Sequence, residues 1–125
     1  PRSLDATTIV DTYLAMWNET DAKRRARLIE QAWVGDGRYT DPMLEAQGHG
    51  ALGEMVAGVQ AKFPGHRFRR RSGVDAHHDQ VRFAWDLIAQ DGAVVVAGID
   101  VGALAADGRL ARITGFFGEA PALTA

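Results

Sequence analysis

The hydrophobic periodicity of the chain changes from helical to strand-like at Pro64-Gly65. Before this point, apolar residues at helical spacing predict helices over residues 4–17, about 22–34 and 49–62. A short extended segment is expected between the last two helices, over 38–41. After it, alternating apolar residues predict strands over 67–77, 80–89, 93–104 and 110–118. Helices followed by a run of hairpins are typical of an α+β domain. We therefore expect a curved antiparallel sheet with the helices packed on one face.

The size and charge of the chain restrict what it can bind. Its 125 residues predict a single domain, covering 1–125, with a hydrophobic core. A net charge of −2 gives no overall attraction to nucleic acid or to an anionic membrane, and no apolar run is long enough to span a bilayer. With no cysteine, disulfides and thiolate metal sites are excluded. The amino terminus lacks the features of a secretory signal, so the cytoplasm is the expected compartment.

Two polar clusters are better explained as surface features than as binding sites. Adjacent residues on a strand point to opposite faces, so His77 and His78 are not expected to share a metal ion, and a polar hairpin turn is favoured there. The arginines between 67 and 71 are interleaved with only one aromatic residue, Phe68. A solvated strand face or the rim of a dimer interface is the favoured interpretation of this run.

Two aspartates lie in segments where a charge is costly. Asp41 lies in Tyr39-Thr40-Asp41-Pro42, and Asp100 ends the apolar run 94–99. A buried carboxylate must be paired, exposed to a cavity or protonated. Together with Tyr13, on the apolar stripe of the first predicted helix, the two acids indicate proton-transfer chemistry in a closed pocket. Taken singly, Asp41 could be a turn residue, Asp100 an outward-facing strand residue paired with an arginine, and Tyr13 a core tyrosine.

The order of the elements and three local segments resemble the nuclear transport factor 2-like superfamily, and within it the SnoaL-like and ketosteroid-isomerase-like proteins. The three segments are Tyr13-Leu14-Ala15-Met16-Trp17-Asn18, Tyr39-Thr40-Asp41-Pro42 and Ala97-Gly98-Ile99-Asp100. They resemble the segments that carry the oxyanion-hole tyrosine, the general base and a protonated aspartic acid in ketosteroid isomerases. The resemblance covers nearly the whole chain. It implies a cone-shaped α+β half-barrel, also described as cystatin-like, with a deep apolar cavity between sheet and helices.

The resemblance also implies a role for each of the three residues. Asp41 would remove a proton from a carbon beside a carbonyl group, and Tyr13 and protonated Asp100 would stabilise the enolate oxygen. The implied reaction is the allylic isomerisation of a compound like a Δ5-3-ketosteroid, and it needs no cofactor or metal. The expected ligand is a hydrophobic small molecule, steroid-like or polyketide-like.

The side chains expected to line the cavity are mostly aromatic or aliphatic. The predicted substrate-binding residues are Trp17, Trp33, Met55, Val59, Phe83, Trp85, Leu87 and Phe117. The sequence departs from the isomerase pattern at Gly98, where proline is common, and at Trp85, which is bulkier than usual for a cavity wall. Some isomerases place further tyrosines behind the oxyanion-hole tyrosine, and the comparable positions here hold Trp33 and Val56. That support is expected to be absent.

Three functions remain open from the sequence. The first is a ketosteroid-isomerase-like proton transfer. The second is a SnoaL-like polyketide cyclase, dehydratase or hydrolase that uses Asp41 as acid or base, and the third is a non-catalytic module that binds a hydrophobic ligand. The outer sheet face, with Arg82, Ala84 and Ile88, mixes apolar and charged groups and has no predicted helix over it. We therefore predict a homodimer through this face, as is common in the family.

Overall fold

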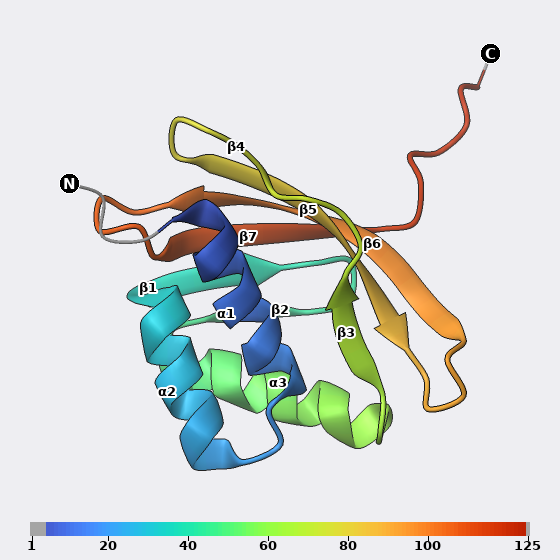
Figure 1. Cartoon of the computed structure of the whole chain (residues 1–125), viewed down its shortest axis with the longest axis horizontal. Coiled ribbons are helices and arrows are strands. Elements are labelled where there is room, and N and C mark those ends of the chain that lie inside the picture. Colours follow the sequence, from blue (N-terminus) through green and yellow to red (C-terminus); the bar gives the residue numbers. More distant parts are fainter. Residues whose placement is uncertain (1–4, 125) are drawn as a thin grey trace.

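A computed structural model describes residues 5–124, which form three helices and a seven-stranded sheet (Figure 1). The helices are α1 (Ala6–Asn18), α2 (Ala22–Ala32) and α3 (His49–Lys62). The strands are β1 (Trp33–Thr40), β2 (Glu45–Gln47), β3 (Arg67–Arg70), β4 (Asp75–His77), β5 (Gln80–Ile88), β6 (Val94–Leu104) and β7 (Leu110–Phe117). The predicted start of the first helix, residue 4, lies outside the described residues.

The first two helices begin at aspartate caps. The Asp5 side chain accepts hydrogen bonds from the backbone N–H groups of Thr7 and Thr8, and Asp21 accepts one from Arg24 N. The apolar stripe of α1 then turns toward the sheet, and its buried residues are Ile9, Val10, Tyr13, Leu14, Met16 and Trp17. This stripe fixes Tyr13 in the interior.

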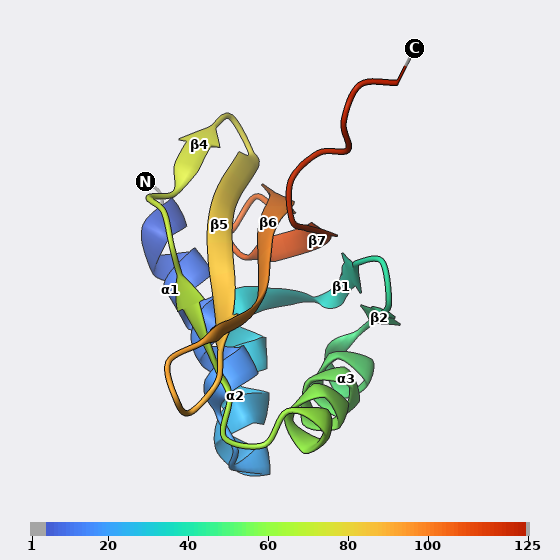
Figure 2. The same cartoon turned by 90° about the vertical axis from the view of Figure 1, so that its right-hand side faces the viewer.

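The sheet has the strand order β2-β1-β7-β6-β5-β3, with β4 paired to β5. Figures 1 and 2 show that it curves and stays open, and that all three helices lie on its concave side. The predicted α+β architecture is therefore confirmed. The sheet differs from an all-antiparallel one at a single pair, because β1 runs parallel to β7. Parallel neighbours need a long connection, and β1 and β7 are separated by α3 and five strands.

Three features of the secondary structure differ from the prediction. The second helix ends at Ala32, and Trp33 instead starts β1, where it pairs with Leu110 of β7. The strand predicted over 67–77 is interrupted and forms β3 and β4, with the 71–74 segment between them. The short strand β2 was not predicted, since three residues are too few for a periodic signal. In each case a tertiary pairing decided the outcome.

The outer face of the sheet is less exposed than expected at two of the three predicted interface positions. Ala84 and Ile88 are both only 8% exposed, whereas Arg82 is exposed. The exposed apolar side chains on this face include the cross-strand pair Ile99 and Phe116. The face therefore offers apolar surface, but from β6 and β7 rather than from β5.

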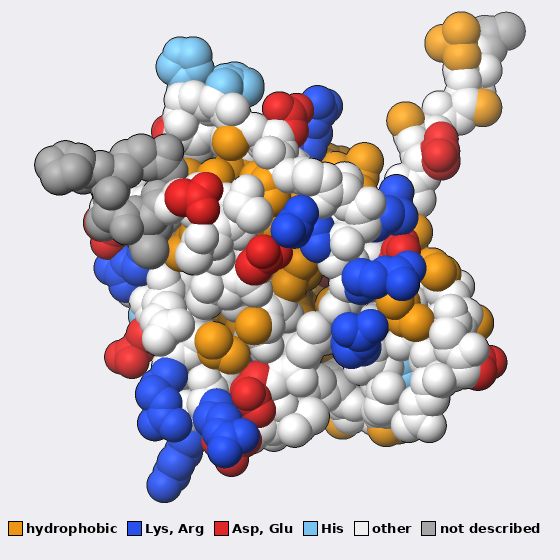
Figure 3. Space-filling view, in the orientation of Figure 1, with side chains coloured by type: hydrophobic (Ala, Val, Ile, Leu, Met, Phe, Trp, Pro, Cys, Tyr) orange, Lys and Arg blue, Asp and Glu red, His pale blue; other side chains and the backbone are white. Residues whose placement is uncertain are grey.

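Two of the arginines between residues 67 and 71 form ion pairs with an aspartate of the sheet. Asp86, on the outer face of β5, is 3% exposed and accepts hydrogen bonds from Arg69 (3.1 Å) and Arg71 (2.8 Å). Figure 3 shows basic side chains over α2 and beside β3, with acidic side chains between them. This mixture fits a solvated protein surface better than a nucleic-acid patch.

His77 and His78 lie at the turn between β4 and β5. Their Nδ1 atoms are 3.0 Å apart, because His78 has a positive φ of 54° and leaves the strand geometry. The two rings therefore lie close together and not on opposite faces of a strand, which differs from the prediction, and the predicted hairpin turn is present.

No helix within residues 5–124 combines the length and apolar character needed to cross a membrane.

Candidate active site

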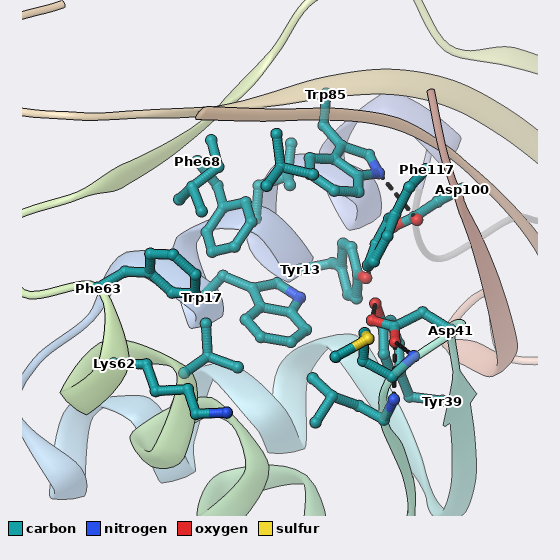
Figure 4. Close-up of a pocket in the computed structure, with 16 residues that line it drawn as sticks. Tyr13, Trp17, Tyr39, Asp41, Lys62, Phe63, Phe68, Trp85, Asp100 and Phe117 are labelled. Carbon is teal, nitrogen blue, oxygen red and sulfur yellow. Dashed lines mark hydrogen bonds between the residues drawn. The ribbon is translucent and has the colours of Figure 1, made fainter. Parts of the chain in front are cut away.

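A cavity of about 320 Å³ lies between the helices and the concave face of the sheet (Figure 4). Its volume is within the range of about 300–1,000 Å³ that is usual for small-molecule sites. The lining residues are Tyr13, Leu14, Trp17, Tyr39, Asp41, Met43, Leu44, Val59, Lys62, Phe63, Phe68, Trp85, Leu87, Val96, Asp100 and Phe117. Most of the wall is therefore apolar, and its carboxylates come from Asp41 and Asp100.

Tyr13, Trp85 and Asp100 form a buried hydrogen-bonded group. The Tyr13 hydroxyl donates to Asp100 Oδ2 at 2.8 Å, and Trp85 Nε1 donates to Asp100 Oδ1 at 2.9 Å. The three residues come from α1, β5 and β6, and none is more than 5% exposed. Both oxygens of Asp100 thus have a donor, and the Tyr13 hydroxyl is held at the cavity wall.

The protonation of Asp100 depends on opposing effects. Burial raises its pKa to about 7, and the nearby charge of Asp41 acts in the same direction. The hydrogen bonds from Tyr13 and Trp85 favour the charged form and limit this rise. Asp100 can therefore carry a proton near neutral pH. Burial, with the Asp100 charge second, also raises the pKa of Tyr13 well above its usual value, which keeps its hydroxyl protonated.

Two departures from the isomerase pattern compensate for each other. Gly98 on β6 is paired with Trp85 on β5. A Cβ atom at Gly98 would collide with the Trp85 indole, which lies against the backbone there. The missing side chain at Gly98 therefore makes room for the large one at Trp85, and this arrangement lets the indole N–H reach Asp100.

Asp41 is fixed by three hydrogen bonds at the end of β1. Its Oδ1 accepts from the backbone N–H groups of Met43 and Leu44, both at 2.8 Å, as in an Asx turn. Its Oδ2 accepts the Tyr39 hydroxyl at 2.6 Å. The turn interpretation of Asp41 is thus correct, and it does not conflict with a place in the cavity. The turn aims the carboxylate into the pocket (Figure 4).

The polar groups converge next to Gly115 on β7. A methyl group there would lie 2.8 Å from Asp100 Oδ1 and 3.3 Å from both Asp41 Cβ and the Tyr39 hydroxyl. Gly115 is also paired with Asp100 across the sheet. The absence of a side chain at this position lets the two acids from β6 and the end of β1 approach one end of the same cavity.

The predicted lining residues divide into two groups. Five of the eight line the cavity: Trp17, Val59, Trp85, Leu87 and Phe117. Trp33 and Phe83 instead lie behind Tyr13, each with its ring centroid 5.9 Å from the tyrosine ring, and Met55 packs against the core. These two aromatic residues buttress Tyr13 through edge-to-face contacts.

Several lining residues were missed by the sequence analysis. Tyr39 carried a signal, because it lies two residues before Asp41 and its hydroxyl bonds that carboxylate. Phe63 also carried a signal, because it continues the apolar spacing of Val59 at the end of the third predicted helix, whereas Phe68 gave none. Lys62 gave no signal either, since a lysine in the last turn of a helix usually faces solvent.

Comparison with solved structures gives a close match to a protein of the SnoaL-like family from Agrobacterium tumefaciens strain C58, provisionally named an isomerase. The identity is 40% over 91% of this chain and 97% of that chain, with a TM-score of 0.87. A Sinorhizobium meliloti protein provisionally named a polyketide cyclase shares the fold at 15% identity (86% of this chain, 93% of that chain, TM-score 0.68). So does a Methylobium petroleophilum protein with a cystatin-like fold, at 16% identity (98% and 82%, TM-score 0.75).

Comparisons with protein-family models and with curated proteins give no match. The structural matches under 25% identity show the fold alone. The Agrobacterium protein is different, because it is 40% identical to this chain over nearly the full length of both. On this similarity, and on a fold that places three helices against a curved open sheet, the chain belongs to the SnoaL-like family.

Proposed function

We propose that this protein catalyses proton transfer at a carbon next to a carbonyl group, as ketosteroid isomerases do. The observation that supports this most strongly is the convergence of Tyr13, Asp41 and Asp100 at one end of an apolar cavity. A carboxylate base, two hydroxyl donors and a dry wall are the parts that enolate chemistry requires. The name of the Agrobacterium relative, an isomerase, agrees with this reaction class.

In the proposed reaction, the carboxylate of Asp41 takes a proton from the carbon between the carbonyl group and the double bond. The electron pair of the broken C–H bond moves into a dienolate, whose oxygen accepts hydrogen bonds from Tyr13 and protonated Asp100. Asp41 then returns the proton to the far end of the dienolate, which leaves a conjugated enone. The substrate oxygen would replace Asp100 Oδ2 as the acceptor of the Tyr13 proton.

Turnover of a Δ5-3-ketosteroid tests this function directly. We expect conversion to the conjugated Δ4 isomer, followed by the ultraviolet absorbance of the enone product. Heat-inactivated protein is the control for the spontaneous reaction. Binding of the steroid without any conversion would contradict the proposal and would favour a ligand-binding module.

A second enzymatic function is supported by one feature of the hydrogen bonding. The bond to Asp100 holds the Tyr13 hydroxyl at the cavity wall, where it could donate to the carbonyl oxygen that a carbanion attacks. With Asp41 as the base that forms the carbanion, this donor would suit the aldol cyclisation of a polyketide chain. The Sinorhizobium protein that shares the fold is named for that activity. A linear polyketide ester that cyclises, together with a ketosteroid that is not isomerised, would favour this function.

We also propose that the protein forms a homodimer through the outer face of its sheet. Ile99 is 38% exposed and Phe116 57% exposed, and they are direct cross-strand neighbours on this face. A second copy would remove both side chains from water. Sedimentation is expected to show a dimer, and Phe116→Glu is expected to shift it to the monomer. A wild-type monomer at high protein concentration would contradict the proposal.

A further inference from the structure

Lys62 is the basic residue of the cavity wall, and it lies across the cavity from the two acids (Figure 4). Its position follows from α3. Val59, Lys62 and Phe63 are three and four residues apart, so they share one face of the helix, and all three line the cavity. Lys62 is itself exposed, so it lies at the solvent-facing rim of the cavity.

The Lys62 ammonium forms no ion pair or hydrogen bond with any residue from 5 to 124. The remaining charged groups of the wall, Asp41 and Asp100, are at the other end with the two tyrosines. An apolar wall separates these ends, so the cavity is acidic at one end and basic at the other. An anionic group on a ligand would be repelled by Asp41 and attracted by Lys62.

We propose that the natural substrate carries an anionic group, such as a carboxylate, at the end of its ring system far from the reacting carbonyl, and that Lys62 binds it. This substrate class rests on the proposed function, because the acidic end is taken as the place of the reacting carbonyl. The two unlike ends then fix the direction in which the substrate enters. An apolar ring system between them would contact the aromatic and aliphatic wall.

Naphthalene probes separate the two ends. 6-Hydroxy-2-naphthoate carries a phenol for the acidic end and a carboxylate on the far ring, 2-naphthol lacks the carboxylate, and 2-naphthoate lacks the phenol. In wild-type protein, 6-hydroxy-2-naphthoate should bind about three- to fivefold more tightly than 2-naphthol, which is the gain usual for an accessible ion pair. The gain should shrink as salt is added. An isomer with adjacent groups, 3-hydroxy-2-naphthoate, should show no gain.

Lys62→Met is the decisive variant, because it keeps the length of the side chain and removes the charge. It should abolish the gain of 6-hydroxy-2-naphthoate over 2-naphthol, and Lys62→Arg should retain it. Lys23→Met is the matched control, since Lys23 is the other lysine of the chain and lies exposed on α2, outside the cavity wall. An unchanged gain in Lys62→Met, or no gain in the wild type, would overturn the inference.

The failure of this inference is distinguishable from the failure of the proposed function. Of the two polar ends, 2-naphthoate engages only Lys62, so its weakening in Lys62→Met supports the anion site whatever the acidic end does. Likewise 2-naphthol engages only the acidic end, and Asp100→Ala is expected to weaken its binding. If only the Asp100 effect is seen, the reaction site stands and the anionic substrate class is wrong.

Discussion

Asp41→Asn is expected to reduce ketosteroid turnover by about 10²–10⁴-fold, the usual contribution of a positioned general base. An asparagine amide cannot take up the proton at neutral pH. Binding of a planar phenol that mimics the enolate, such as 2-naphthol, should stay the same or become tighter, because a negative charge near the bound oxygen has been removed. Steady-state rates and a binding titration on the same preparation measure the two effects.

The structure explains why this variant should fold. The asparagine oxygen can accept the hydrogen bonds that Asp41 Oδ1 now accepts from Met43 N and Leu44 N. Its amide can donate to the Tyr39 oxygen, which replaces the present 2.6 Å bond with one of opposite direction. Asp36→Asn is a matched control, since it makes the same chemical change at an exposed position of β1, the strand that ends just before Asp41. Full turnover in Asp41→Asn would exclude Asp41 as the base.

Asp100→Ala is expected to lose on the order of 2.7–4 kcal/mol of transition-state stabilisation, as when one oxyanion donor is removed. Asp100→Asn should keep much more activity and mimic affinity. The asparagine oxygen can still accept from Trp85 Nε1, and its amide remains a donor beside Tyr13. Alanine leaves a void, and it also leaves two buried donors without partners, each at a cost of about 1–3 kcal/mol.

The comparison of the two variants is the informative measurement. If Asp100→Asn and Asp100→Ala bind the mimic equally well, then Asp100 is not an oxyanion donor. The melting temperature of each variant separates a loss of stability from a loss of function. Asp100→Ala should unfold at a lower temperature than Asp100→Asn, because alanine leaves both the Tyr13 and the Trp85 donor unpaired, whereas the asparagine oxygen still accepts from Trp85 Nε1.

The pH dependence of turnover gives a second measure of the Asp100 proton. Burial raises the pKa of Asp100 to about 7, so the protonated donor is lost as the pH rises through that value. Turnover of the wild type should therefore fall on the alkaline side of about pH 7, and Asp100→Asn should lack this decline. Trp85→Phe removes a hydrogen bond that favours the charged form. The pKa of Asp100 should then rise, and the decline should move to higher pH.

The sequence determined the order and type of the main elements. Helical spacing in α1 and α3 and alternation in β5 are local patterns, because each depends on residues fewer than ten positions apart. They were enough to predict the α+β class and the inward position of Tyr13. The segments around Tyr13, Asp41 and Asp100 also indicated one shared cavity, and all three residues line it.

The ends of elements were less predictable, for a physical reason that Trp33 illustrates. Its apolar side chain fitted the helical stripe of the second helix equally well. The parallel pairing of β1 with β7 placed it in a strand instead, so that its ring packs behind Tyr13 rather than in the cavity. A backbone pairing with Leu110, 77 positions later, cannot be seen in a local pattern.

Only the tertiary structure decided the chemistry of the two ends of the cavity. The bonds of Tyr13 and Trp85 to Asp100 join residues 87 and 15 positions apart. They depend on the sheet's register and on the space left by Gly98 and Gly115. The place of Lys62 on the rim depends on how α3 packs against the open end of the sheet. The sequence determined which groups are present, whereas the curvature of the sheet and the packing of the helices determined which of them meet.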